Sequence, residues 1–221
     1  MAKGSGGPGT GGASQASGGA LVQGIGPAEA GRARDVLGIA PTESAMADVL
    51  GVSGIEGARV SAGMRSDGAV VVTAVWPVAG GEAHITRTFR RGPKGLTVHH
   101  DNILLPEAAQ GAGLARPILA QQFRAYDRLG VKRVTLDAAK TGRYVWPRAG
   151  YEAPADQTRR VRAAFERQTG VDARGMSVGD IARHPKGKAF LTSPVAPTIF
   201  GMHVDRGTPG WASVRAYLER T

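Results

Sequence analysis

The sequence predicts an α/β (α+β) fold, in which a mixed and mostly antiparallel sheet is flanked by helices. Between residues 58 and 105, four extended runs are separated by short glycine-containing turns, which is the pattern of an antiparallel meander. Between residues 103 and 138, an apolar strand leads through a glycine turn into an amphipathic helix and then into a further strand. This second unit extends the meander into a mixed sheet.

Ahead of the sheet, the sequence predicts a tail and two short helices. Residues 1–19 are almost entirely Gly, Ser, Ala, Thr and Gln, a composition that buries too little apolar surface to offset the entropy of ordering. We therefore expect a flexible tail over residues 1–20 and one domain over residues 21–221. Thr42 is a suitable helix cap and Gly51 a suitable helix end. The two predicted helices are Pro27–Leu37 and Thr42–Leu50.

Residues that favour turns bound each strand of the meander. The turn segments are Ser66-Asp67-Gly68, Gly80-Gly81 and Gly92-Pro93-Lys94-Gly95. They delimit four predicted strands, which are Ala58–Arg65, Ala69–Trp76, Ala83–Arg91 and Leu96–Leu105. Apolar residues then recur at helical spacing from Leu114 to Leu129, and Gly130 ends that helix. Alternating apolar residues predict a further strand over Val131–Ala138.

The C-terminal part of the domain, residues 154–221, is less regular than its core, residues 27–153. We expect it to contribute a helical insertion, a late strand and a C-terminal helix. Ser177 and Asp180 have the spacing of a capping pair. The predicted elements are helices Asp156–Gln168 and Ser177–Arg183, a strand Thr198–Val204, and a last helix that begins at Thr208-Pro209. Tyr151–Ala153 is expected to pair with the late strand.

Composition excludes several classes of protein. The chain contains no cysteine, so disulfides, thiolate metal ligands and cysteine nucleophiles are excluded. It has no run of about 18 apolar residues and no secretory pattern at its N-terminus, so we expect no membrane span and a cytoplasmic location.

The charge of the chain is strongly positive, with 28 Lys and Arg against 18 Asp and Glu. Such a balance favours nucleic acid, an acidic protein surface or a phosphorylated coenzyme as partner, and charge alone does not choose among them. Aromatic residues do not alternate with the arginines of the helix that follows residue 156, which favours a solvated helix face over a nucleic-acid site. These arginines are Arg159, Arg160, Arg162 and Arg167.

The segment from Ile103 to Ala115 is the strongest functional signal. Its glycines allow a ligand to approach the main chain closely, and the N–H groups of a first helical turn attract anions. The spacing Gln110-x-x-Gly113-x-Ala115 resembles the pyrophosphate-binding signature of the GNAT superfamily of acyl-CoA N-acyltransferases. The resemblance implies acetyl-CoA or another acyl-CoA as the ligand. The coenzyme-binding residues that it implies are Leu104, Leu105, Gln110, Gly111, Ala112, Gly113, Leu114, Ala115 and Arg116.

A second segment, Arg143–Tyr151, resembles the short aromatic helix that ends in Gly-Phe or Gly-Tyr in the same superfamily. The position four residues before Gly150 often holds a tyrosine that protonates the departing thiolate, and this chain has Trp146 there. Tyr144 is the nearest hydroxyl and our candidate acid, with packing against the sheet as its alternative role. A common asparagine after the fifth strand is also missing. This form of the segment resembles GNAT-like modules of phage virion proteins and delivered toxins.

Candidates for a catalytic base lie on the strand before the glycine turn. His99 and Asp101 are expected on one face of that strand and His100 on the other, because successive strand residues alternate. We select His99 and Asp101 as candidate bases; Glu107, just past the strand, is another possible base, for which the role of a solvent-exposed turn residue is favoured. The divergence of His99 and His100 argues against a metal site, so none is predicted.

Two functional hypotheses follow, and a third has less support. The first is an acetyltransferase that moves an acyl group from acyl-CoA to an unidentified amine by direct attack. The second is a non-catalytic GNAT-fold component of a phage virion or another large assembly, which would place the chain in a virion among other subunits. Nucleic-acid binding through the arginines is the third, and no recognisable binding module accompanies it.

Overall fold

The computed structural model describes residues 19–220, so the predicted tail over residues 1–20 lies outside the described part except for its last two residues. A six-stranded sheet has the strand order β1-β2-β3-β4-β5-β6, with β4 and β5 parallel and every other neighbouring pair antiparallel. This mixed α/β architecture is the predicted fold class and is consistent with a GNAT-like fold. The strands are β1 Arg59–Met64, β2 Val70–Val78, β3 Gly81–Gly92, β4 Gly95–Leu104, β5 Arg133–Ala138 and β6 Ile199–Asp205.

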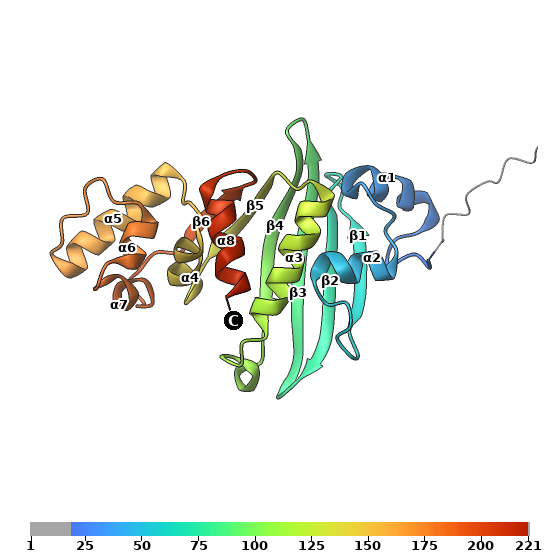
Figure 1. Cartoon of the computed structure of the whole chain (residues 1–221), viewed down its shortest axis with the longest axis horizontal. Helices are drawn as coiled ribbons and strands as arrows, with labels where there is room; N and C mark the ends of the chain where they lie inside the picture. Colours follow the sequence, from blue (N-terminus) through green and yellow to red (C-terminus); the bar gives the residue numbers. More distant parts are fainter. Residues whose placement is uncertain (1–18, 221) are drawn as a thin grey trace, which may run out of the picture.

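Helices α1, α2, α3 and α8 lie over one face of the sheet, and α5, α6 and α7 gather at the end of the molecule beyond β6 (Figure 1). The helices in chain order are α1 Pro27–Leu37, α2 Glu43–Leu50, α3 Ala115–Leu129, α4 Gly142–Ala149, α5 Ala155–Thr169, α6 Val178–Arg183, α7 Gly187–Leu191 and α8 Pro209–Glu219, with a 3-10 turn at Glu107–Ala109. No helix of the described residues is both long and apolar enough to cross a membrane.

The meander forms where the turn residues predicted it, and each of its strands ends within two residues of the predicted bounds. Alternation of side chains explains why the sheet is stable. In β2, Val70, Val72, Ala74 and Trp76 are buried against the helices, whereas the residues between them are half-buried on the opposite face. Full burial of each large apolar side chain stabilises the fold by about 1.5–3 kcal/mol.

Strands β4 and β5 stay paired only near their beginnings. Their parallel register runs from Thr97 opposite Arg133 to His100 opposite Leu136, although β4 continues to Leu104. A register shift at Thr86 and Arg87 of β3 lies beside this point. A bulge of this kind bends a strand and interrupts its ladder. The outer end of β4 therefore diverges from β5 and leaves the edge that faces β5 without a strand partner.

Helix α3 buries the side chains that its sequence spacing predicted, including Ile118, Phe123 and Tyr126. Gly130 follows with φ of 70°, the left-handed conformation typical of a helix end. The helix does not follow the strand as directly as the sequence suggested, because the 3-10 turn and an irregular loop over residues 110–114 come first. Leu114 precedes α3 without a side-chain cap.

The C-terminal part has the predicted insertion, with one helix that was not predicted. The five residues of α7 are too few to show a helical period, so sequence reasoning missed this helix. Ser177 caps α6 as expected, since its Oγ accepts from the N–H of Asp180 at 3.0 Å and the Asp180 carboxylate accepts from the N–H of Ser177 at 2.9 Å. The segment Tyr151–Ala153 contributes one isolated bridge, from Glu152 to His203, instead of a full strand.

Candidate ligand pocket

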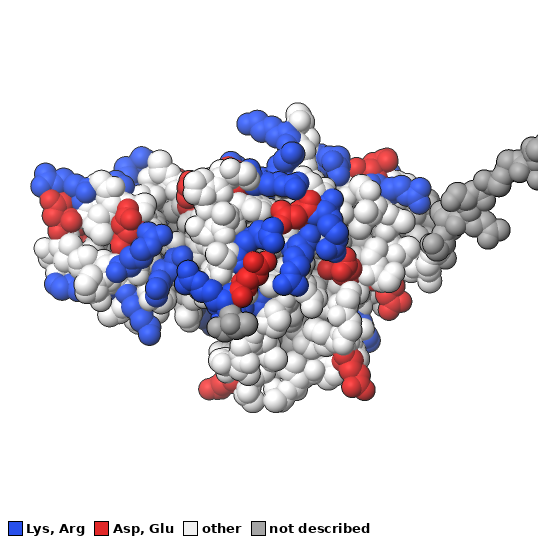
Figure 2. Space-filling model, viewed as in Figure 1, with Lys and Arg blue, Asp and Glu red and all other residues white. Residues whose placement is uncertain are grey.

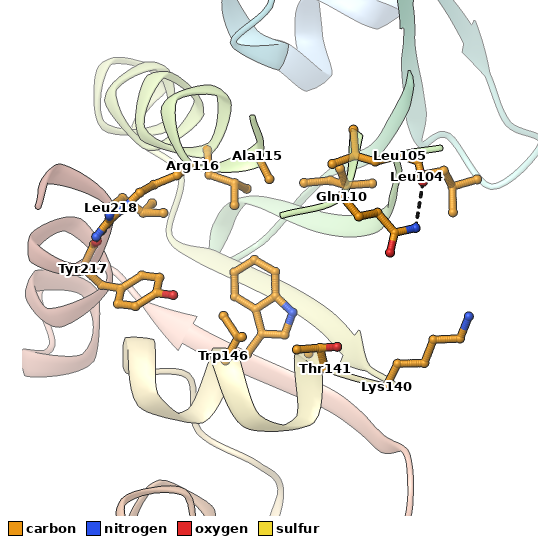
Figure 3. Close-up of a pocket in the computed structure, with 14 residues that line it drawn as sticks. Leu104, Leu105, Gln110, Ala115, Arg116, Lys140, Thr141, Trp146, Tyr217 and Leu218 are labelled. Carbon is orange, nitrogen blue, oxygen red and sulfur yellow. Dashed lines mark hydrogen bonds between the residues drawn. The ribbon is translucent and has the colours of Figure 1, made fainter. Parts of the chain in front are cut away.

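A pocket of about 600 Å³ opens where β4 diverges from β5. Four parts of the chain enclose it: the end of β4 with the loop that follows, the first turns of α3, the beginning of α4, and the last turn of α8. Figure 3 shows Trp146 between Gln110 and Lys140 on one side and Tyr217 and Arg116 on the other. The lining residues are Ile103, Leu104, Leu105, Gln110, Ala115, Arg116, Leu119, Lys140, Thr141, Gly142, Val145, Trp146, Tyr217 and Leu218.

The end of β4 supplies an apolar wall whose outer edge pairs with no strand. Ile103, Leu104 and Leu105 line the pocket beyond the last residue that pairs with β5. Leu104 is 57% exposed, which is unusual for a leucine of this sheet. Unpaired strand edges bind extended ligands through main-chain hydrogen bonds. This wall therefore suits an extended chain that carries amide groups and an apolar stem.

The loop before α3 exposes its backbone. Gly111 and Gly113 have φ of 79° and 77°, a conformation that strains any residue with a side chain. A Cβ atom added to either glycine would have no atom within 4 Å, so the space beside the main chain is open. Within the described residues, the N–H groups of Gly111, Ala112 and Gly113 donate to no other backbone group. The loop therefore presents free donors at the positive end of α3.

Gln110 and Arg116 border this loop, but internal hydrogen bonds hold both side chains. The Gln110 amide donates to the carbonyl of Leu105 at 3.0 Å, which joins the loop to the end of β4 (Figure 3). The Arg116 guanidinium donates twice to the carbonyl of Tyr217, at 3.2 and 2.7 Å, and lies 5.4 Å from the centre of the Tyr217 ring. Arg116 thus attaches the last turn of α8 to α3 while its positive charge remains in the pocket wall.

Lys140 lines the pocket and was not predicted from sequence as a site residue. Its φ of 48° makes it the single non-glycine residue with positive φ in the part of the chain that the structure describes. Strained backbone of this kind is concentrated at functional sites. No sequence signal could have identified it, because a lysine between a strand and a helix is ordinarily a solvent-exposed residue.

Trp146 forms the wall contributed by α4. Its ring packs against that of Tyr151, with centroids 5.3 Å apart. A Cβ on Gly142 would lie 3.1 Å from the indole, so a glycine at this position gives the indole room. The indole N–H is too weak an acid to protonate a thiolate. The side-chain hydroxyls among the lining residues belong to Thr141 and Tyr217.

The three residues selected from sequence as catalytic do not line this pocket. The Nδ1 atom of His99 bonds the hydroxyl of Thr135 at 2.9 Å, and the Asp101 carboxylate accepts from Thr88 at 3.1 Å. These residues project from the face of the sheet opposite α3, as the alternation of β4 predicted for His99 and Asp101. Tyr144 is partly buried against the core, and its hydroxyl accepts from the guanidinium of Arg148.

The arginines of α5 have the surroundings of a mostly solvated helix face. Arg159, Arg160 and Arg167 are exposed, while Arg162 donates to the carbonyl of Met176. On the face shown in Figure 2, Lys and Arg side chains cross α3 and α8 with Asp and Glu between them. One such ion pair joins Arg215 to Asp127 at 2.9 Å. On this face, acidic side chains therefore interrupt the basic ones.

The chain is a mixed α/β protein with a pocket between diverging strands. Among residues 19–220, no three His, Asp or Glu side chains lie close enough together to hold a metal ion. Comparison of the chain with protein-family models finds no match, and comparison with curated proteins finds none either.

Proposed function

We propose that the pocket binds an acyl-CoA thioester and that the chain is a GNAT-type N-acyltransferase. The observation that carries the proposal is the position of the pocket, which lies between two diverging parallel strands and beside an open glycine loop at the start of α3. The free edge of β4 suits the amide groups of a pantetheine arm. The loop suits a diphosphate. Both features belong to one cavity, which favours a single extended ligand.

The loop would bind the phosphates through its main chain. Gly111, Ala112 and Gly113 offer N–H donors without internal partners, and α3 adds the positive end of its dipole. Lys140 and Arg116 supply positive charge from the two sides of the pocket. Gln110 would act indirectly, since its amide is already bonded to Leu105 and fixes the loop.

Bound acyl-CoA would supply a thioester carbonyl that an amine can attack. A neutral amine then forms a bond to the carbonyl carbon, the carbon–sulfur bond breaks, and the amine loses one proton. The backbone N–H of Leu104 or Leu105 would stabilise the developing oxyanion. The thiolate takes up one proton in place of the one that the amine loses, and the phenol hydroxyl of Tyr217, which lines the pocket, is a stronger acid than the alcohol of Thr141. The amine acceptor stays unassigned.

One observation favours a second function, that of a non-catalytic component of a phage virion or other assembly. Trp146 replaces the residue that would protonate the thiolate, and His99, Asp101 and Tyr144 lie outside the pocket lining. A protein that had lost turnover would keep the fold and the cleft without these groups. The two functions also imply different locations, the cytoplasm for the enzyme and the virion for the structural component.

Thermal unfolding with acetyl-CoA tests the proposed ligand. At about a hundredfold excess over the dissociation constant, a ligand that binds the folded state adds about 2.7 kcal/mol to the free energy of unfolding. For a chain of this size, that gain raises the melting temperature by about 5–10 °C. Release of free thiol with a panel of amines then tests turnover.

A matched pair of variants locates the site. Gly113→Leu and Gly175→Leu change glycines with φ of 77° and 80°, and a Cβ added at either position would have no atom within 4 Å. Both variants should lose similar stability through backbone strain, but only Gly113→Leu should lose the response to acetyl-CoA. No response in the unaltered chain would exclude the enzyme. A response without thiol release for any amine would favour the non-catalytic component.

A further inference from the structure

Arg87 is the largest fully buried side chain of the protein's described part, and one half of its guanidinium has a clear structural role. Its Nη1 atom donates to the carbonyls of Thr86 and Asn102, at 2.8 and 2.7 Å. These carbonyls lie at the register shift between β3 and β4, where the ladder is interrupted. Its Nε atom donates to the side-chain oxygen of Gln122 at 3.1 Å. Arg87 thereby stabilises the bulge beside which β4 leaves β5.

The other half of the guanidinium, at Nη2, does not hold the bulge. The Nη2 atom is buried and has no hydrogen-bond partner among residues 19–220. No carboxylate of the described chain forms an ion pair with Arg87. Asp101 is bonded to Thr88 on the opposite face of the sheet. A buried charge without an anionic partner is costly, so a negative group from outside the chain would stabilise this arrangement.

His100 is the neighbour of Arg87 across the two strands, because the register pairs these two residues. Its Nε2 atom lies 3.0 Å from the hydroxyl of Tyr126, and that hydroxyl donates to Gln122 at 3.2 Å. The hydroxyl hydrogen is therefore used, and His100 must donate from Nε2. Its Nδ1 atom is buried without a partner, and so is the hydroxyl of Tyr151 within the described residues.

The charge of this cluster is unbalanced in the chain alone. Burial, followed by the positive charge of Arg87, holds the pKa of His100 well below its ordinary value. Burial raises the pKa of Tyr126 to about 12 and that of Tyr151 well above its ordinary value. Both tyrosines and His100 are therefore neutral at physiological pH. Arg87 leaves the cluster with one positive charge.

We infer that the unpartnered edge of Arg87 and the neighbouring imidazole of His100 form a buried site for one small anion, either a halide or a short carboxylate. A proton taken up by Nδ1 of His100 on binding turns that atom from a bare acceptor into a second donor. The hydroxyl of Tyr151, which is also buried without a partner among the described residues, is the third candidate group for the anion. This inference is independent of the proposed acyl-CoA pocket.

Proton uptake follows from the groups that surround His100. Tyr126 and Phe123 of α3 pack against its ring, with centroids 5.7 and 6.3 Å away. Arg87 of β3 faces it, and its sequence neighbours His99 and Asp101 project from the opposite face of β4. Burial opposes protonation of His100, and so does the positive charge of Arg87. A bound anion offsets that repulsion, so anion binding and protonation favour each other.

Thermal unfolding of the full chain in different sodium salts tests this site. Chloride, bromide and formate are compared with gluconate, an anion too large for a buried site, at equal ionic strength. At about tenfold excess over the dissociation constant, the three small anions should raise the melting temperature by about 3–6 °C more than gluconate. This additional rise in melting temperature should grow as the pH falls toward the pKa of His100, which lies well below its ordinary value in the anion-free chain.

Two variants and one control assign the effect to the cluster. Arg87→Met should abolish the additional rise, and Tyr151→Phe, which keeps the shape of the ring, should reduce it. Arg90→Met on the same strand removes a surface charge that pairs with Asp67 and should leave the additional rise unchanged. Equal melting temperatures of the unaltered chain in chloride, formate and gluconate would overturn the inference, because buried water would then satisfy the cluster. That result would leave the acetyl-CoA test unaffected.

Discussion

The close approach of Gly150 and Gly210 fixes α8 over the pocket, and substitution of either glycine should disturb it. A Cβ on Gly150 would lie 2.6 Å from the carbonyl oxygen of Gly210 and 2.9 Å from the Cβ of Ser213. A Cβ on Gly210 would likewise lie 2.6 Å from the carbonyl oxygen of Gly150. The ends of α4 and α8 therefore meet with no room for a methyl group. The same two helices carry Trp146 and Tyr217 to the pocket.

The cost of Gly150→Ala has two parts. Gly150 has φ of 122°, and an L-residue in such a conformation costs about 1–3 kcal/mol. Forcing a methyl group into the contact costs about 1–3 kcal/mol more. The sum, about 2–6 kcal/mol, is a large part of the stability of an ordinary domain, which is about 5–15 kcal/mol. We expect the melting temperature to fall by about 10 °C, at about 2–4 °C per kcal/mol.

Two further variants separate the parts, with urea unfolding as the assay. Gly170→Ala changes a glycine with φ of 69° at which an added Cβ would have no atom within 4 Å, so it reports backbone strain alone. Gly210→Ala lies in the first turn of α8 and reports the contact alone. Alanine ordinarily stabilises a helix relative to glycine by up to about 1 kcal/mol. A gain in stability from Gly210→Ala would show that the two segments do not touch, and the reasoning would fail.

Two other predictions concern stability. Ser177→Ala should cost about 1 kcal/mol in urea unfolding, because it removes one half of the reciprocal cap with Asp180, while Ser177→Asn should restore most of that loss. The guanidinium of Arg133 bonds the Asp205 carboxylate at 2.5 and 2.7 Å and lowers its pKa below 3.8. The stability from this pair is therefore present above the unfolded-state pKa and is lost as the pH falls through the folded-state pKa. Asp205→Asn should lower the free energy of unfolding by under about 1 kcal/mol at neutral pH, since the pair is partly exposed. It should also weaken the loss of stability at acid pH, and an unchanged loss would contradict this prediction.

Local sequence determined most of the fold. The turn residues between the strands and the period of α3 set the meander and the crossover helix, because these signals depend on neighbours a few residues apart. The same holds for the cap of α6 and for the glycine loop at Gly111 and Gly113. A glycine permits positive φ at its own position, and this local property can be predicted without knowledge of tertiary contacts.

The sequence could not determine which side chains meet in the pocket. It selected His99, Asp101 and Tyr144, but hydrogen bonds to Thr135, Thr88 and Arg148 hold these groups outside the lining. Strand alternation separates His99 and Asp101 from the covered face, but no local pattern shows which end of a sheet will open. The pocket arises from the loss of pairing beyond His100 and Leu136, which involves strands more than thirty residues apart.

Only the tertiary structure shows that Lys140 and Tyr217 line the pocket and that Arg87 is buried in the core. Lys140 gains significance from a backbone strain that its neighbours impose, and Tyr217 reaches the pocket because α8 folds back over α3. In the sequence, nothing distinguishes Arg87 from a surface arginine of a strand. Its burial depends on the helices packed over it and on a register shift between two strands, and interactions between distant segments of this kind leave no periodic signal in the chain.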